Sequence, residues 1–76
     1  VNPSTNIEVD VPVNGNVMLK IYDVSGKEVA RLINNEFRNA GSYSVDFNAS
    51  FLSSGVYFYK LEAGTFTGIK KMLFVK

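Results

Sequence analysis

The side chains that could do chemistry in this sequence are carboxylates and lysines, because the chain contains no His and no Cys. Their absence excludes the commonest general base, the Cys–His nucleophile pair and most transition-metal sites. No Asp-x-Asp-x-Asp-Gly calcium loop occurs either. The sequence therefore predicts no catalytic residue, no metal site and no cofactor. The seven carboxylates stand singly, in expected turns or on solvated strand faces: Glu8, Asp10, Asp23, Glu28, Glu36, Asp46 and Glu62.

Three short motifs could suggest other sites, and each has a simpler structural interpretation. Gly41-x-Tyr43 and Gly55-x-Tyr57 do not indicate a phosphate-binding loop, because no strand-to-helix transition follows either glycine. The triplet at residues 48–50 matches a glycosylation acceptor, but an asparagine at a strand end commonly bonds its own backbone. We therefore interpret all three as turn or strand-end features.

Lysines and aromatic residues offer two further candidates for recognition. Lys70 and Lys71 are neighbours in an expected strand, so they point to opposite faces and do not form one patch. Charged residues there also block edge-to-edge aggregation. Tyr22, Phe58 and Phe66 could stack on sugar rings, although core packing accounts for most of the aromatic residues.

Length, charge and composition narrow the classes of protein. We expect one domain over residues 1–76, burying only roughly 60% of the unfolded surface. A net charge of +1 with dispersed basic residues argues against nucleic-acid binding. The longest apolar run is about four residues, which predicts no membrane span. Because the chain does not begin with Met, we expect a piece of a longer polypeptide.

The first third of the chain predicts two strands. Ile7, Val9 and Val11 alternate with acidic residues, and Pro12 ends this strand. Asn14-Gly15 is favoured in tight hairpins, so the first strand is expected to pair with the second, residues 17–22.

The middle of the chain is less regular. Residues 23–26 have turn chemistry, and residues 28–33 are interpreted as a strand rather than a two-turn helix without an N-cap. Residues 34–41 are expected to form a loop, with a short edge strand around Phe37 as the alternative. Residues 42–48 alternate again, and residues 49–54 predict a single turn in which Phe51 or Leu52 plugs the sandwich.

The last 22 residues predict a hairpin of two strongly apolar strands, residues 56–61 and 66–75. The first is apolar on both faces, which suits a central strand covered on both sides or a strand with a functional apolar face. The second places Ile69, Leu73 and Val75 on one face with Lys71. Its other face carries Phe66, Met72 and Phe74 with Lys70 and Lys76. We expect its exposed face to be unusually apolar.

Six to seven short strands and no substantial helix predict an all-β, Ig-like antiparallel β-sandwich. Gly55-x-Tyr57 supports this, because immunoglobulin-like domains carry a Gly-x-Tyr-x-Cys tyrosine corner. Here Tyr59 stands at the cysteine position.

Several segments of the chain form a familiar series: Asn2-Pro3-Ser4-Thr5, then VSGKEVARL, AGSYSVDFNAS, SGVYFYKLEAG and finally KKMLFVK. With these segments, and over essentially all of its length, the sequence resembles the C-terminal sorting domain of the type IX (Por) secretion system. The resemblance implies a non-catalytic sorting signal, appended to secreted hydrolases or adhesins of Bacteroidota. Such a domain directs its parent protein from the periplasm across the outer membrane, to the cell surface or the medium.

The resemblance also implies partners and signal-bearing positions. The implied partners are a protein of the secretion machinery and the upstream domains of the same chain, and the terminal strands could also mediate self-association. A carbohydrate-binding or structural accessory module of a secreted hydrolase remains the alternative. The positions implied for sorting are Gly55, Tyr57, Lys71, Met72, Leu73, Phe74, Val75 and Lys76.

Overall fold

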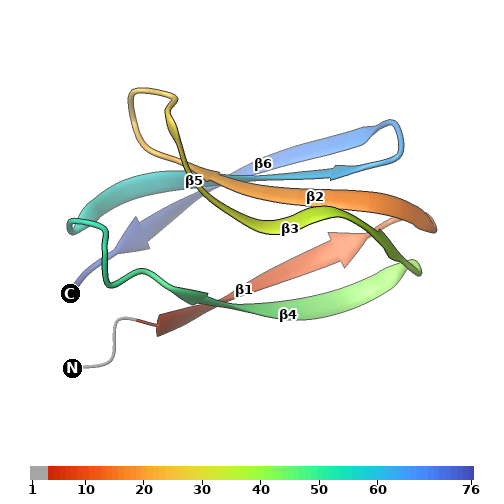
Figure 1. Ribbon diagram of the computed structural model, residues 1–76, viewed down its shortest axis with the longest axis horizontal. Helices are drawn as coiled ribbons and strands as arrows, with labels where there is room; N and C mark the ends of the chain where they lie inside the picture. Colours follow the sequence, from red (N-terminus) through yellow and green to blue (C-terminus); the bar gives the residue numbers. More distant parts are fainter. Residues whose placement is uncertain (1–3) are drawn as a thin grey trace.

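The computed structural model describes residues 4–76, which fold into six strands in two layers (Figure 1). One sheet has two strands in the order β1-β4, and the other has four in the order β3-β2-β5-β6, with every neighbouring pair antiparallel. The predicted all-β antiparallel sandwich is thus confirmed, and the described residues contain no helix. Residues 1–3, with the start of the expected turn-rich entry, lie outside the described part. The strands are β1 (Ser4–Val11), β2 (Gly15–Tyr22), β3 (Glu28–Arg38), β4 (Gly41–Asn48), β5 (Gly55–Ala63) and β6 (Phe66–Phe74).

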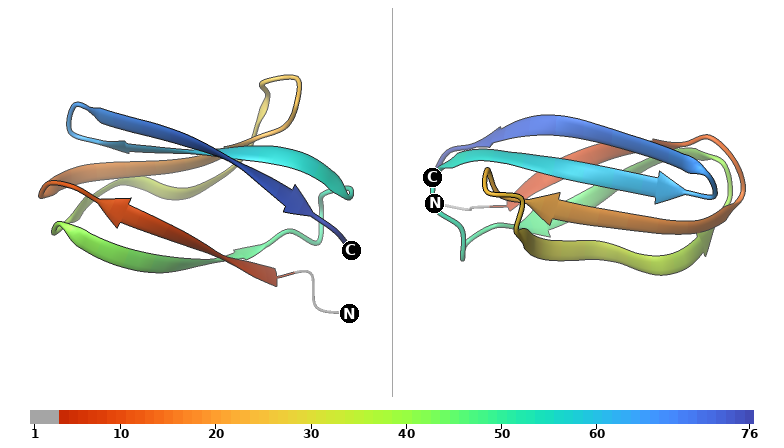
Figure 2. Two further views of the ribbon diagram at one scale, coloured as in Figure 1. Left: turned by 180° about the vertical axis from the view of Figure 1, so that it is seen from behind. Right: turned by 90° about the horizontal axis from the view of Figure 1, so that it is seen from above.

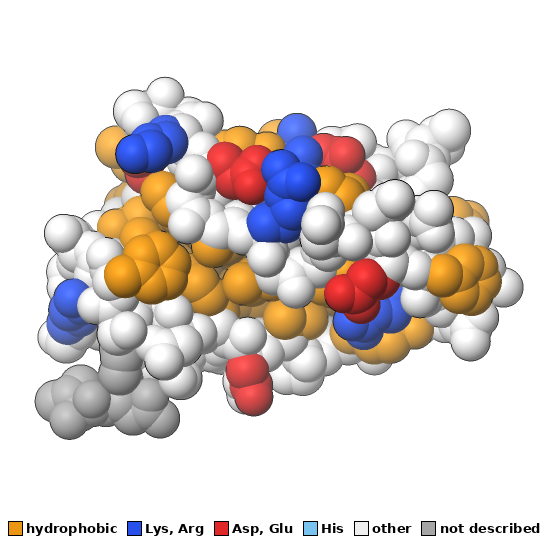
Figure 3. All heavy atoms as spheres, in the orientation of Figure 1, with side chains coloured by type: hydrophobic (Ala, Val, Ile, Leu, Met, Phe, Trp, Pro, Cys, Tyr) orange, Lys and Arg blue, Asp and Glu red, His pale blue; other side chains and the backbone are white. Residues whose placement is uncertain are grey.

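The core lies between the two sheets and follows from the period-two patterns. Val17, Leu19 and Ile21 of β2 are fully buried, whereas the residues between them face away from the core. Because successive residues of a strand point to opposite faces, each layer contributes every second side chain to the core. Figure 3 shows apolar side chains along the band between the layers. From the smaller sheet the core receives Ile7, Val9, Val11 and Phe47.

The predicted hairpin between the first two strands is wrong. β1 pairs with β4, whereas β2 lies in the other sheet between β3 and β5 (Figure 2). A tight type I′ turn needs positive φ at both central residues, and Asn14 has no positive φ. Its side chain instead accepts a hydrogen bond from the Ala40 N–H (2.7 Å), where β3 crosses to β4. Placing the two strands in opposite sheets lets their apolar faces pack against each other.

The loop predicted at residues 34–41 is also largely wrong, because β3 continues to Arg38. The strand assignment for residues 28–33 and the edge position of Phe37 are confirmed. The register against β2 shifts three times, and Asn35 has φ of 55°. Such bulges admit extra residues into an edge strand, so this polar segment stays paired while it faces solvent.

The turn after β4 closes one end of the sandwich as predicted. Of the two candidate plugs, Leu52 is buried and its N–H bonds the Ala49 carbonyl (2.9 Å). Phe51 is exposed and meets the ring of Phe47 edge-on, with ring centroids 6.1 Å apart. The plug is therefore Leu52.

A tyrosine corner is present at the start of β5. The Tyr57 hydroxyl donates to the Ser53 carbonyl (2.7 Å), four residues upstream. Tyr43 repeats the arrangement near the start of β4, where its hydroxyl donates to the Asn39 carbonyl (2.6 Å). Both bonds tie a strand to the connection that enters it.

The turn between β2 and β3 is organised by one carboxylate. Asp23 Oδ1 accepts hydrogen bonds from the Ser25 hydroxyl (2.6 Å), the Ser25 N–H (2.9 Å) and the Lys27 N–H (3.1 Å). The bond from the Ser25 hydroxyl, followed by that from the Lys27 N–H, holds the pKa of Asp23 below its ordinary value of 3.8. These bonds favour the charged form, so protonation of Asp23 weakens the turn.

We expect part of the acid sensitivity of the fold to come from Asp23. A pKa lowered in the folded state contributes stability above its ordinary value, and this contribution is lost as the pH falls through the folded pKa. The urea midpoint should therefore fall as the pH is lowered through the ordinary value of 3.8 and further below it. Asp23→Asn should flatten this dependence, whereas Asp46→Asn, at an exposed position on β4, should leave it unchanged. An unaltered pH profile in Asp23→Asn would contradict the assignment.

Candidate recognition surface around the terminal strand

Strand β6 lies at one edge of the four-stranded sheet, paired along its length with β5. The two strands meet in a two-residue turn, Gly64-Thr65, with Ala63 directly opposite Phe66. Gly64 has φ of 60°, which suits the first central position of a type II′ turn. The hairpin predicted for the last 22 residues is confirmed, with β5 as a central strand.

The register with β5 decides which face of β6 is buried. Met72 lies opposite the buried Tyr57, and Phe74, only 6% exposed, belongs to the same face. Leu73 and Ile69 occupy the other face and are 71% and 62% exposed. The prediction of an unusually apolar exposed face is therefore confirmed.

The exposed face of β6 continues over β5 and β2. Leu73 lies opposite Val56, and Phe58, opposite Lys71 on β6, is also paired with Tyr22 of β2. Val56, Phe58 and Tyr22 are half-buried. We call this face the outer apolar surface, defined by Tyr22, Val56, Phe58, Ile69 and Leu73.

Basic side chains surround the outer apolar surface. Lys60 Nζ lies 3.1 Å from Glu62 Oε2 and 5.5 Å from the centre of the Tyr22 ring. The hydrogen bond with Glu62, and then the neighbouring Tyr22, raise the pKa of Lys60. Lys20 is 3.9 Å from the same carboxylate, and Lys71 projects from β6 itself. One carboxylate thus serves two lysines, which leaves this part of the surface basic.

The eight residues implied for sorting divide between interior and surface. Gly55 and Tyr57 of β5 lie opposite Phe74 and Met72 of β6, on the face toward the core. These four residues support the fold. The residues that reach the surface are Lys71, Leu73, Val75 and Lys76.

Lys76 is tied to the turn after β4. Its N–H donates to the Ser54 hydroxyl (3.0 Å), and its Nζ donates to the Ser50 carbonyl (3.0 Å). The last residues therefore dock onto the turn that holds Leu52. One of the hydrogen bonds of the Lys76 ammonium group is made within the domain.

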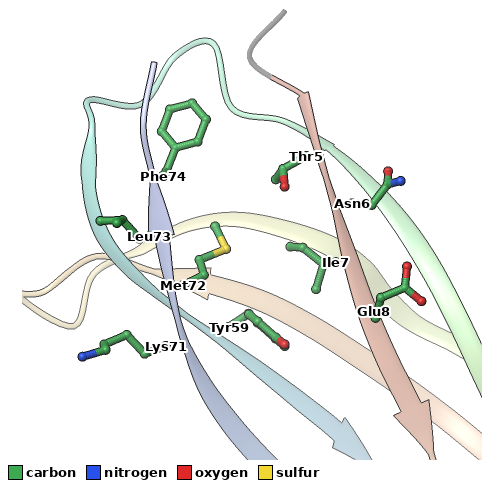
Figure 4. A pocket seen from close by; sticks show the side chains of 9 residues that line it. All are labelled: Thr5, Asn6, Ile7, Glu8, Tyr59, Lys71, Met72, Leu73 and Phe74. Carbon is green, nitrogen blue, oxygen red and sulfur yellow. The ribbon is translucent and has the colours of Figure 1, made fainter.

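Sequence reasoning missed a groove between β1 and β6, because β1 was expected to pair with β2. One hollow of about 320 Å³ is lined by Thr5 and Ile7 of β1, by Tyr59, and by Met72 and Phe74 (Figure 4). A second hollow of about 180 Å³ continues between the same two strands. We call the two together the β1–β6 groove. The second hollow is lined by Glu8, Val9, Asp10, Leu61, Phe66, Gly68 and Lys70.

The structure adds no support for the other sites considered from the sequence. The side chain of Asn48 accepts a hydrogen bond from the Ser50 N–H (3.0 Å), as expected for a strand end. Tyr22 and Phe58 are neighbours on the outer apolar surface, but Phe66 belongs to the other face of β6. No cluster of three or more acidic, His or Cys side chains within residues 4–76 could hold a metal ion. Nor does this part of the chain contain a helix long and apolar enough to cross a membrane.

Comparison with known families gives one match. The family model described as a secretion system C-terminal sorting domain matches residues 2–76, which is nearly the whole chain. Comparisons with curated proteins and with solved structures gave no significant match.

Proposed function

The chain belongs to the family of secretion-system C-terminal sorting domains, and on that premise we propose that the outer apolar surface is where the secretion machinery recognises it. The domain is a sorting signal for type IX secretion. It directs the protein that carries it across the outer membrane, to the cell surface or the medium. The family is one of sorting domains and not of catalytic domains, and the sorting role implies contact with the secretion machinery.

The observation that supports this surface is the contrast between the two faces of β6. Phe74 and Met72 already close the core, so the fold does not require Leu73 and Ile69 to be large and apolar. Exposed apolar side chains that adjoin further apolar residues commonly mark a protein interaction site. Together with Val56 and Phe58, they offer a continuous surface on the outer face of the sheet. Lys71 adds a charge that suits an acidic rim on the partner.

This proposal divides the eight implied sorting residues into two roles. Leu73, Lys71 and Val75 contact the machinery, whereas Gly55, Tyr57, Met72 and Phe74 hold β5 and β6 in position. Lys76 anchors the end of the chain to the turn through its bonds with Ser54 and Ser50. No feature of the surface favours the sugar-binding alternative.

An export assay tests the proposal. The 76 residues are fused behind a signal peptide and a reporter, in a bacterium with a type IX system. Ile69→Ser/Leu73→Ser should lower the surface or secreted reporter about tenfold, because it removes the centre of an interface. The reporter should accumulate in the periplasm, while the melting temperature of the purified domain should hardly change.

The matched control is Val24→Ser/Phe37→Ser, which removes two comparably exposed apolar side chains, 74% and 64% exposed. Phe37 lies on β3, at the edge of the sheet opposite β6, and Val24 lies in the turn after β2. This control should be exported normally. Equal export of both double variants, or an equal loss in both, would contradict the proposed surface. Deleting residues 73–76 is a less selective test, because it also removes Phe74 and the bonds of Lys76.

A further inference from the structure

The β1–β6 groove is flanked by two open sheet edges. Within residues 4–76, β1 pairs only with β4 and β6 pairs only with β5, so each strand has one side without a neighbouring strand. An open edge offers backbone N–H and C=O groups to an added strand. We propose that the groove receives one extended strand of a partner protein, which pairs with β6 and presents two consecutive acidic residues to Lys70 and Lys71.

This inference rests on the proposed function, because it names the chemistry of a contact with the export machinery. It concerns the edge of β6, whereas the proposed function concerns the outer face. A test of binding at the edge can therefore fail while the export result stands, and the reverse also holds.

The hollow beside Met72 supports the pairing. Directly opposed residues of neighbouring strands point to the same side of a sheet. A residue of the added strand opposite Met72 would thus point into the larger hollow, where Met72, Ile7 and Tyr59 converge (Figure 4). An aliphatic side chain would cover the exposed edge of the core there.

Lys70 and Lys71 determine which residue types we expect at the next two positions of the partner strand. Lys70 projects toward the side of the core and Lys71 toward the outer face. Neither forms an ion pair within residues 4–76, whereas Lys20 and Lys60 share Glu62. Because consecutive strand residues alternate in direction, two consecutive carboxylates on the partner would reach both lysines.

The same acidic strand would pair poorly with β1. Glu8 and Asp10 lie on β1 along the groove, and like charges on neighbouring strands destabilise pairing. An acidic strand therefore favours the β6 edge over the β1 edge.

A second copy of this chain fits the edge poorly. Pairing β6 with another β6 around its centre would bring lysines from the two copies together. Pairing β6 with another β1 would place Ile7 or Val9 beside the inward-facing Lys70, which would then be buried without a partner. An inward-pointing charge on an edge strand is a known protection against self-pairing.

The test uses the 76-residue chain and the blocked peptide acetyl-Ser-Leu-Glu-Glu-Thr-Ile-Ser-amide, which is designed to pair antiparallel with β6. Binding is followed by amide chemical shifts up to about 5 mM peptide. Its Leu and Ile flank the inward Glu, and its other Glu faces Lys71. The control peptide carries Lys-Lys in place of Glu-Glu and needs no protein variant. We expect shifts along β6 and about tenfold tighter binding of the acidic peptide than of the control.

Charge reversal completes the test. Lys70→Glu/Lys71→Glu changes two exposed residues, should remain folded, and should prefer the Lys-Lys peptide. Equal binding of both peptides, shifts confined to β1, or no binding at the highest concentration would overturn the proposal. So would sedimentation of the chain alone as a dimer that Lys70→Glu/Lys71→Glu disrupts, since a second copy would then occupy the edge.

Discussion

Replacing Leu19 with alanine is expected to lower the free energy of unfolding by about 3 kcal/mol. Leu19 is fully buried at the centre of β2, paired with Ile33 of β3 and Leu61 of β5. Truncation leaves a cavity that neighbours on both sides cannot fill without moving two strands. The change should appear as a lower urea midpoint with an unchanged dependence on urea concentration.

The size of this effect matters because the domain is small. A chain of 76 residues is expected to have a total stability of about 4 to 11 kcal/mol. Losing about 3 kcal/mol raises the unfolded fraction more than a hundredfold. The control is Val24→Ala, at an exposed position in the turn after β2, which should change stability by less than about 0.5 kcal/mol. Similar midpoints for the two variants would contradict the central role of Leu19.

The sequence predicted the strands better than it predicted their partners. The alternation in β1, β2 and β4 and the double-sided apolar pattern of β5 identify these strands directly. Asn14-Gly15 correctly marks a reversal of the chain. It does not reveal whether the next strand stays in the same sheet, because both arrangements bury the same alternating residues. The hydrogen bond from the Ala40 N–H to Asn14 joins the β1–β2 connection to the β3–β4 connection. Its two partners are 26 residues apart in the sequence.

Strand β3 shows a second kind of error. A polar segment around Asn35 has the composition of a loop, and composition is what sequence reasoning uses. At an edge, however, bulges let polar residues remain in a strand, and the positive φ of Asn35 takes up the extra length. The pairing with β2 overrides the local preference there.

The apolar exposed face of β6 was predicted, but not which of its two faces it is. Both faces of β6 carry large apolar residues. The alternation of side chains along the strand therefore assigns each residue to one of two faces, but it does not show which face is buried. Only the register with Tyr57 and its buried neighbours assigns Met72 to the core. The β1–β6 groove could not be predicted, because it joins strands from the two ends of the chain that share no sheet.

The adjacent residues Phe74 and Leu73 should differ in their effect on stability and in whether a stabilising change restores export. Phe74→Ala is expected to lower the free energy of unfolding by about 3 kcal/mol, because the ring is buried beneath the end of β6. Leu73→Ala should change stability by less than about 0.5 kcal/mol, because its side chain lies mostly in solvent. Urea unfolding of the purified domains measures both values.

Export of the reporter then separates folding from recognition. Leu73→Ala should reduce export at full stability, since it truncates a residue of the outer apolar surface that we propose contacts the machinery. A stabilising change elsewhere should restore export to Phe74→Ala, whose outer surface is intact, but not to Leu73→Ala. If stabilisation rescued both variants equally, Leu73 would act through the fold alone, and the division of β6 into a supporting face and a recognition face would be wrong.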